Sequence, residues 1–196
     1  MLGAIKHAIA NLGNPNGRDA RQTFWYWMLV VFILRYAAGM VTSFPMTMRI
    51  MNKTMASVGN PDQVDPVAMQ AEMMAMIADD LPRMVWIGVA IGVVSMLLLT
   101  ASIVRRLHDS NLSGWLVLVP GGLYAIALAQ APRQIEAAAA MLKSIKANSP
   151  PDMAQMLQAQ SGIGLLAWVA IGLVIWIGLR KSDEGPNRYG DAPVRF

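Results

Sequence analysis

Four long apolar runs alternate with polar, turn-rich segments along this chain. The runs cover residues 24–44, 84–104, 115–131 and 163–179. A helix needs about 20 apolar residues to cross the ~30 Å hydrocarbon core of a membrane. The pattern therefore predicts an all-α polytopic membrane protein, in which four transmembrane helices form a single bundle.

The N-terminal segment has a helical pattern of its own. Leu2, Ile5, Ile9 and Leu12 recur at spacings that place them on one face of a helix over residues 1–13. Such a helix can lie in the membrane interface with this stripe in the lipid, or it can pack on its own protein. Both interpretations stay open at this point.

The two long connections also have helical patterns. Apolar stripes continue through 45–83 and 132–162, with turn signals at 59–65 and 148–152. Asp65, followed directly by a proline, is a predicted helix N-cap. We expect the transmembrane helices to continue beyond the bilayer and to form helical hairpin regions on its outer side.

Three features interrupt or modify the apolar runs. Arg35 lies inside the first run, where a charge is costly and marks either a polar pathway or a snorkelling side chain. Gly88 and Gly92 form a small-residue face suited to close helix packing. Pro120, followed by two glycines, predicts a broken third helix. Arg35 and this break are the basis of one alternative function, a small channel or transporter.

Composition agrees with a membrane protein of one domain. The chain has 196 residues, of which 55% are hydrophobic and 14% charged, against about 25% charged in soluble domains. Its mean hydropathy is +0.42. Because it contains no Cys, disulfides and thiolate metal sites are excluded. We expect no cleavable signal peptide, since the first residues lack an apolar run of sufficient length.

The distribution of basic residues predicts the orientation. Nine Lys and Arg lie in three compact segments, namely the N-terminal tail, residues 105–114 and the tail 180–196, whereas the two longer connections hold six. Cytoplasmic segments carry the excess of Lys and Arg. The sequence therefore predicts four crossings of the membrane with both termini in the cytoplasm.

A basic cluster is the main candidate site on this inner face. Its proposed anion- or lipid-binding residues are Arg18, Arg21, Arg105, Arg106, His108 and Asp109. Guanidinium groups match phosphate geometry, and basic residues beside a membrane attract anionic lipid. The alternative is that the arginines only set the topology, while the histidine and aspartate tie the loop.

Metal and catalytic chemistry have weaker signals. Eight of the 16 methionines lie between residues 45 and 83, and thioether clusters suit Cu(I), although methionine also fills helix contacts. These candidate ligands are Met46, Met48, Met51, Met55, Met69, Met73, Met74 and Met76. No catalytic residue is assigned. His108 and Asp109 would need a nucleophile and an oxyanion site, and the nearby Ser110 and Ser113 are so close in sequence that they rarely reach triad geometry. We expect no enzyme activity and no cofactor.

Four short segments together resemble a known family. They are Gly17-Arg18-x-x-Arg21-x-x-Phe24-Trp25, then Arg105-Arg106-Leu107-His108-Asp109, then Ser113-Gly114-Trp115 with Pro120 after it, and finally Asn187-Arg188-Tyr189-Gly190 with Pro193. In this order they resemble bacterial inner-membrane proteins of the domain of unknown function 805 family. The resemblance implies an integral plasma-membrane protein with several helices and implies no activity. Compared with the compact family pattern, residues 45–83 are long and Met-rich, and 123–161 look inserted.

The expected function follows from these points. We expect a non-enzymatic membrane component that binds anionic lipid headgroups or a protein partner, possible partners including a second copy of itself, through its inner face. The alternatives are the channel or transporter and, with less support, a Cu(I)-binding outer region. We expect no nucleic-acid partner.

Overall fold

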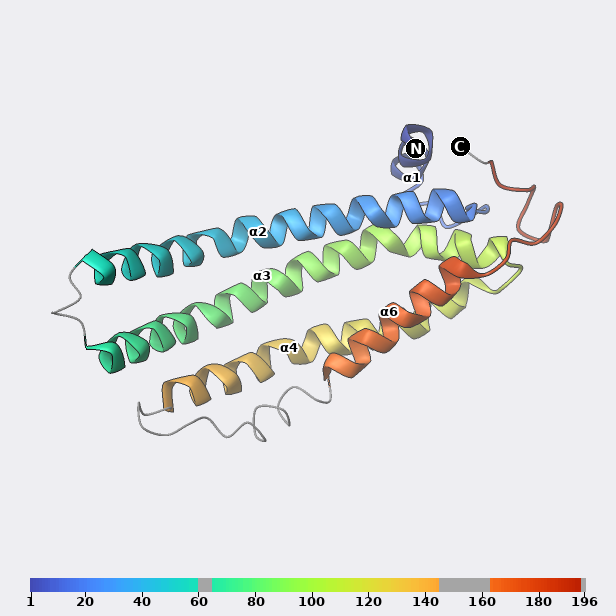
Figure 1. The fold of residues 1–196 in the computed structure, drawn as a ribbon. Coiled ribbons are helices and arrows are strands. Elements are labelled where there is room, and N and C mark those ends of the chain that lie inside the picture. Colours follow the sequence, from blue (N-terminus) through green and yellow to red (C-terminus); the bar gives the residue numbers. More distant parts are fainter. Residues whose placement is uncertain (60–64, 145–162, 195–196) are drawn as a thin grey trace.

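The fold is an elongated bundle of helices, described by a computed structural model over residues 1–59, 65–144 and 163–194. Long helices run side by side along one axis, and both termini lie at the same end (Figure 1). The elements are α1 (Leu2–Ala10), α2 (Arg21–Gly59), α3 (Pro66–Asp109), the 3₁₀ turn η2 (Gly114–Val117), α4 (Leu118–Ser144) and α6 (Ile163–Leu179). The described residues contain no β-strand, which confirms the all-α prediction.

Apolar length makes several of these helices membrane-spanning candidates. Among the described residues, Arg21–Ser57, Pro66–Asp109 and Gly114–Arg133 are long and apolar enough to cross a membrane, and Gly164–Leu179 is a shorter apolar helix. Large apolar side chains such as Phe32 and Leu97 stay exposed on the bundle surface, as expected for groups that face lipid. The structure therefore supports a helical membrane protein. The shorter apolar helix, α6, packs alongside α4 (Figure 1).

The third apolar run is not interrupted at Pro120 and the two glycines after it, so this part of the sequence prediction is wrong. The run begins as the 3₁₀ turn η2 and passes into α4 at Leu118. α4 is continuous from Leu118 to Ser144, and Pro120 lies in its first turn. The first four N–H groups of a helix have no intrahelical acceptor, so a proline there removes no hydrogen bond. The predicted break, on which the transport alternative partly depended, does not exist.

The prolines inside the two preceding helices do not end those helices either. Pro45 lies inside α2 and Pro82 lies inside α3, and both helices continue on either side. Asp65 caps α3 as predicted, with its side chain accepting a hydrogen bond from Val67 N at 2.9 Å. Residues 46–59 and 66–83 therefore extend the two helices as an antiparallel pair. The predicted turn at 148–152 and a predicted helix start near 152 lie outside the described residues.

α1 packs on the bundle through two alanines and Ile5, while two of its larger apolar residues are exposed. Ala4 and Ala8 are buried, and Ala8 belongs to an apolar cluster with Trp27 and Val31 of α2. Leu2 and Ile9 of the predicted stripe are exposed. Ile5 and Leu12 are partly buried against the same cluster. α1 thus combines both sequence interpretations, since one face packs on protein and another presents apolar side chains outward.

Two glycines allow close contacts between helices. A Cβ on Gly92 of α3 would lie 2.8 Å from a methyl carbon of Leu128 on α4, whereas nothing lies within 4 Å of the same position on Gly88. A Cβ on Gly178 of α6 would lie 2.7 Å from the ring of Phe24 on α2. Of Gly88 and Gly92, the two glycines expected to form a packing face together, only Gly92 makes a close helix contact.

Candidate functional site

Three segments that are distant in sequence meet at the end of the bundle that carries both termini. They are residues 17–19 before α2, residues 105–109 and the tail 180–190 after α6. The sequence pattern placed 105–109 in a connection, but these residues form the last turn of α3. The two arginines therefore have fixed positions on a helix and point into the protein, where both are buried.

Asp19 is the first centre of the site. Its carboxylate accepts hydrogen bonds from Arg105 Nε at 2.9 Å and from Ser102 Oγ at 2.8 Å, and His7 Nε2 lies 3.3 Å from it. Arg105 also donates to the backbone carbonyls of Asn11 and Asn14, at 2.7 and 2.6 Å. One buried ion pair thus joins α3 to the segment between α1 and α2.

Asp109 is the second centre. One carboxylate oxygen accepts from Arg18 Nη2 at 3.1 Å and from Arg18 Nε at 3.3 Å, and the other accepts from Arg106. Arg18 further donates to the carbonyls of Asp183 at 2.8 Å and Gly185 at 2.6 Å. Arg106 also donates to a backbone carbonyl of the tail, that of residue 180. Both arginines therefore connect the tail to the end of α3.

An aromatic stack holds the far part of the tail. The rings of His108 and Tyr189 are parallel within 7°, with centroids 3.8 Å apart. His108 Nδ1 lies 3.2 Å from the carbonyl oxygen of Gly17, and the Asn187 amide donates to the His108 carbonyl at 2.9 Å. A Cβ on Gly114 would lie 2.8 Å from His108 Nε2, so a glycine at this position leaves room for the imidazole.

Ion pairing explains why the arginines tolerate burial. Arg18, Asp19, Arg105, Arg106 and Asp109 are all less than 7% exposed. Removing a charged group from water costs several kcal/mol unless ion pairs and further hydrogen bonds compensate. Here two carboxylates face three guanidinium groups, and backbone carbonyls accept further donors of all three arginines. Within the described residues, Arg106 Nε is the one network donor that is buried without an acceptor. We call these five residues the buried ion-pair network.

The other predicted inner-face residues lie around the network. Arg21 is exposed, whereas Phe24 is fully buried in a cluster with Leu107. Trp25 packs against that cluster and contacts Phe24 edge-on, with centroids 5.5 Å apart. Ser113 precedes η2, and Trp115 is 79% exposed, so its ring is available to the membrane interface.

Gly190 and Arg188 shape the tail. Gly190 adopts a φ of +127°, a conformation that favours glycine, and its backbone exchanges two 3.0 Å hydrogen bonds with Asn187. The Arg188 guanidinium lies 4.7 Å from the centre of the Tyr189 ring. The last motif of the sequence is therefore a tight turn that presents Tyr189 to His108.

His108 and Asp109, although adjacent in sequence, have different contact partners. His108 contacts Gly17 and Tyr189, whereas Asp109 contacts Arg18 and Arg106. Because both residues are in the last turn of α3, successive side chains point in different directions and meet different partners.

The remaining candidates lie elsewhere. Arg35 is exposed on α2 among exposed apolar side chains, including Leu34 and Tyr36. Of the eight candidate copper ligands, Met51 and Met55 are exposed, and the other six are half-buried along the paired extensions of α2 and α3. Copper binding stays a prediction. Within the described ranges, no group of three or more His, Asp or Glu side chains could hold a metal ion.

Sequence reasoning missed Asp19, which the structure places at the centre of half the network. A signal was present, because Asp19 stands between Arg18 and Arg21 in an otherwise basic segment. A carboxylate in that position indicates internal pairing of arginines. Asp109 was included, but as a possible ligand contact and not as the partner of Arg18 and Arg106.

A pocket of about 420 Å³ lies beside the network. The start of α2 forms one wall and the tail after α6 forms the other. Its charged lining residues are Arg21, Lys181, Asp183 and Glu184. Lys181 donates to Glu184 at 2.9 Å, and this hydrogen bond and the positive charge hold the pKa of the Glu184 carboxyl below its ordinary value. Glu184 is therefore ionised at neutral pH.

The architecture defines a class: a helical membrane protein whose helix ends are joined by a buried ion-pair network. A family profile described as "Protein of unknown function (DUF805)" matches residues 12–191. The chain belongs to this family, as its four motifs indicated. The comparisons with curated proteins and with solved structures returned no match.

Proposed function

We propose that this protein is a non-enzymatic integral membrane protein that binds anionic lipid headgroups at the end carrying both termini. The observation that carries the proposal is the exposure of basic side chains around the buried network. Lys6, Arg21, Lys181 and Arg188 are exposed there, close to the ends of the apolar helices. Basic residues in this position attract anionic lipid with about 1 kcal/mol each.

The buried arginines have a different role in this proposal. Each of them already donates to Asp19 or Asp109 and to backbone carbonyls, and Arg106 Nε is buried, so a headgroup would have to replace internal hydrogen bonds. The network instead holds the N-terminal segment and the tail against α3. This arrangement keeps the exposed cations at fixed positions on the membrane surface.

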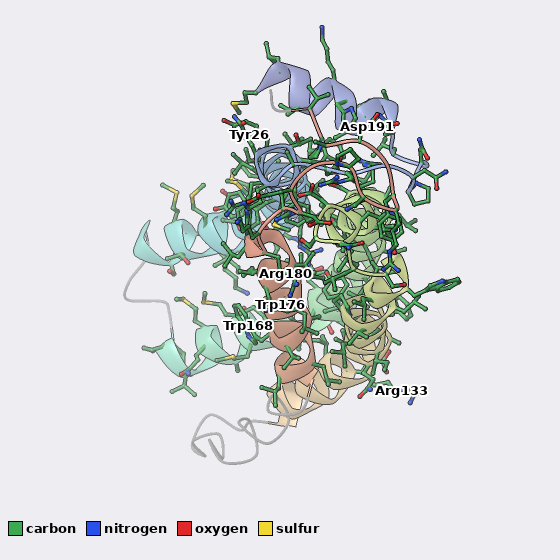
Figure 2. The ribbon with its side chains drawn as sticks, turned by 90° about the vertical axis from the view of Figure 1, so that its right-hand side faces the viewer. Tyr26, Arg133, Trp168, Trp176, Arg180 and Asp191 are labelled. Atoms are coloured by element: carbon green, nitrogen blue, oxygen red, sulfur yellow. The ribbon has the colours of Figure 1, made fainter. Side chains whose placement is uncertain are left out.

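The same end provides anchors for the bilayer. Arg180 lies over the Trp176 ring, 4.8 Å from its centre, at the end of α6. Figure 2 shows Trp168, Trp176 and Arg180 following one another along this helix. Aromatic and basic residues of this kind gather at membrane–water boundaries. We propose four crossings of the bacterial inner membrane, with α6 as the fourth, and both termini in the cytoplasm.

Lipid retention tests the proposal. A Lys6→Gln and Arg188→Gln double variant removes two exposed cations outside both the network and the pocket lining. We expect native mass spectrometry to show about fivefold less phosphatidylglycerol retained for each charge removed. The matched control is Arg49→Gln with Lys53→Gln at the opposite end, which should leave retention unchanged. Equal losses in both variants would sink the proposal.

A further inference from the structure

The pocket beside the network has walls that the network itself holds in place. On the tail side, Arg18 binds the carbonyls of Asp183 and Gly185, and Asp183 N donates to the Asp109 carbonyl at 2.7 Å. On the helix side, the Asp19 backbone N–H donates to the carbonyl of Arg105 at 3.2 Å, directly before the start of α2. Both walls are thus fixed by contacts of their backbone to the network, and the charged lining side chains take no part in those contacts.

The lining combines two cations with two carboxylates. Arg21 and Lys181 are exposed and basic, while Asp183 and Glu184 are exposed and acidic. A purely anionic ligand would be attracted by the first pair and repelled by the second. A ligand with a phosphate at one end and an ammonium at the other matches both pairs. The pocket should therefore select such a zwitterionic ligand over a purely anionic one.

The position of the pocket suits a lipid headgroup. Arg21 begins α2 three residues before the apolar run, and Lys181 follows α6 by two residues. The residues just inside are aromatic, including Trp25 and Tyr26 on α2 and Trp176 on α6. The pocket is therefore at the level where headgroups meet water. Its volume is within the range of pockets that bind small ligands.

We propose that this pocket binds a phosphoethanolamine group, with Arg21 and Lys181 on the phosphate and Asp183 and Glu184 on the ammonium. Its source is phosphatidylethanolamine of the adjacent leaflet. The proposal rests on the proposed placement of this end at the membrane surface. The exposed Lys181–Glu184 pair is weak enough to exchange for ligand contacts.

Lipid competition on the full-length purified protein tests the pocket. Native mass spectrometry would compare retention of phosphatidylethanolamine and phosphatidylglycerol with identical acyl chains. For the lipid bound at this site, we expect phosphatidylethanolamine to be retained about fivefold more than phosphatidylglycerol. The Asp183→Asn and Glu184→Gln double variant should abolish that preference while total lipid retention persists. Both side chains lie outside the buried network, so the fold should be preserved.

The matched control is Asp191→Asn. This residue is on the same tail, where Figure 2 labels it, and it is not among the residues that line the pocket. It should keep the preference. A preference that survives the double variant, or that is absent while phosphatidylglycerol is still retained, overturns the pocket and leaves the proposed function standing. Retention of neither lipid overturns both.

A second titration distinguishes the source of the group. Free phosphoethanolamine added to lipid-depleted protein should bind much more weakly than the lipid, because the soluble compound lacks the acyl chains. Equal saturation by the free compound, with no preference between the two lipids, would overturn the lipid as the source.

Discussion

The two ends of the bundle both use ion pairs, but in different surroundings. At the end with the termini, Arg18 pairs with Asp109 and Arg105 with Asp19, and all four side chains are at most 3% exposed. At the opposite end, Arg49 pairs with Asp80 at 2.7 Å and Lys53 with Glu72, and in each pair at least one partner is more than half exposed. The first set joins segments 86 and 91 residues apart, and the second joins two adjacent antiparallel helices.

This comparison separates two roles of the same interaction. Water screens the exposed pairs, so each contributes little to stability. In the buried network, loss of one partner leaves a charge without water or counter-ion. The network, together with the His108–Tyr189 stack, therefore holds the loops and the tail in place, whereas the opposite end depends mainly on helix continuity. The following predictions test this difference from the largest expected effect to the smallest.

Asp109→Asn should be the most damaging change. It keeps the side-chain shape but leaves Arg18 and Arg106 without their shared carboxylate, which we expect to cost about 3–5 kcal/mol in the free energy of unfolding. Denaturant unfolding in detergent micelles measures it. Glu72→Gln is the matched control at the other end and should cost less than about 1 kcal/mol. Similar losses for both variants would contradict the comparison.

Gly178→Ala should have the next largest effect. The new Cβ would approach the rings of Phe24 and Trp25 to within 2.8 Å, so α6 would have to shift away from α2. We expect a cost of about 1–3 kcal/mol in unfolding free energy. Gly172→Ala in the same helix has open space and is the control. The packing argument fails if the two alanines destabilise equally.

Tyr189→Ala should release the tail with a smaller effect on the bundle. Loss of the stack on His108 should cost about 0.5–1.5 kcal/mol. Limited proteolysis should then cut the tail after α6 more rapidly, while the helices stay resistant. Tyr189→Phe keeps the ring and should behave as the unmodified protein does. Unchanged cleavage in Tyr189→Ala would show that the arginine contacts alone hold the tail.

Arg49→Gln should have the smallest effect. Its pair with Asp80 is half exposed, and such pairs contribute about 0.2–1 kcal/mol. Thermal unfolding at low and high salt measures the change, which should shrink as salt screens the pair. A loss comparable with that of Asp109→Asn would remove the distinction between the two ends.

Much of the fold was predictable from local pattern. Apolar runs of membrane length, the Asp65 cap and the continuation of α2 and α3 beyond those runs all depend on neighbouring residues. The wrong prediction of a helix break at Pro120 also came from local sequence pattern. Proline breaks a helix in its interior but not in its first turn, and the pattern did not show where α4 begins.

The sequence by itself determined the helical class, the membrane-length helices, the family and the gathering of basic motifs at one end. These properties follow from composition, periodicity and motif order. Only the tertiary structure decided that Arg18 and Arg105 point inward, because their partners Asp109 and Asp19 come from segments nearly half the chain away. Arg106 pairs with Asp109 three residues on in the same helix, and the fold adds the backbone carbonyl of Arg180 as a second acceptor. The positions of charged residues along a sequence do not show which of them form ion pairs. Burial and pairing depend on how helix ends converge, and here that convergence leaves Arg21 and Lys181 as the cations that line the pocket.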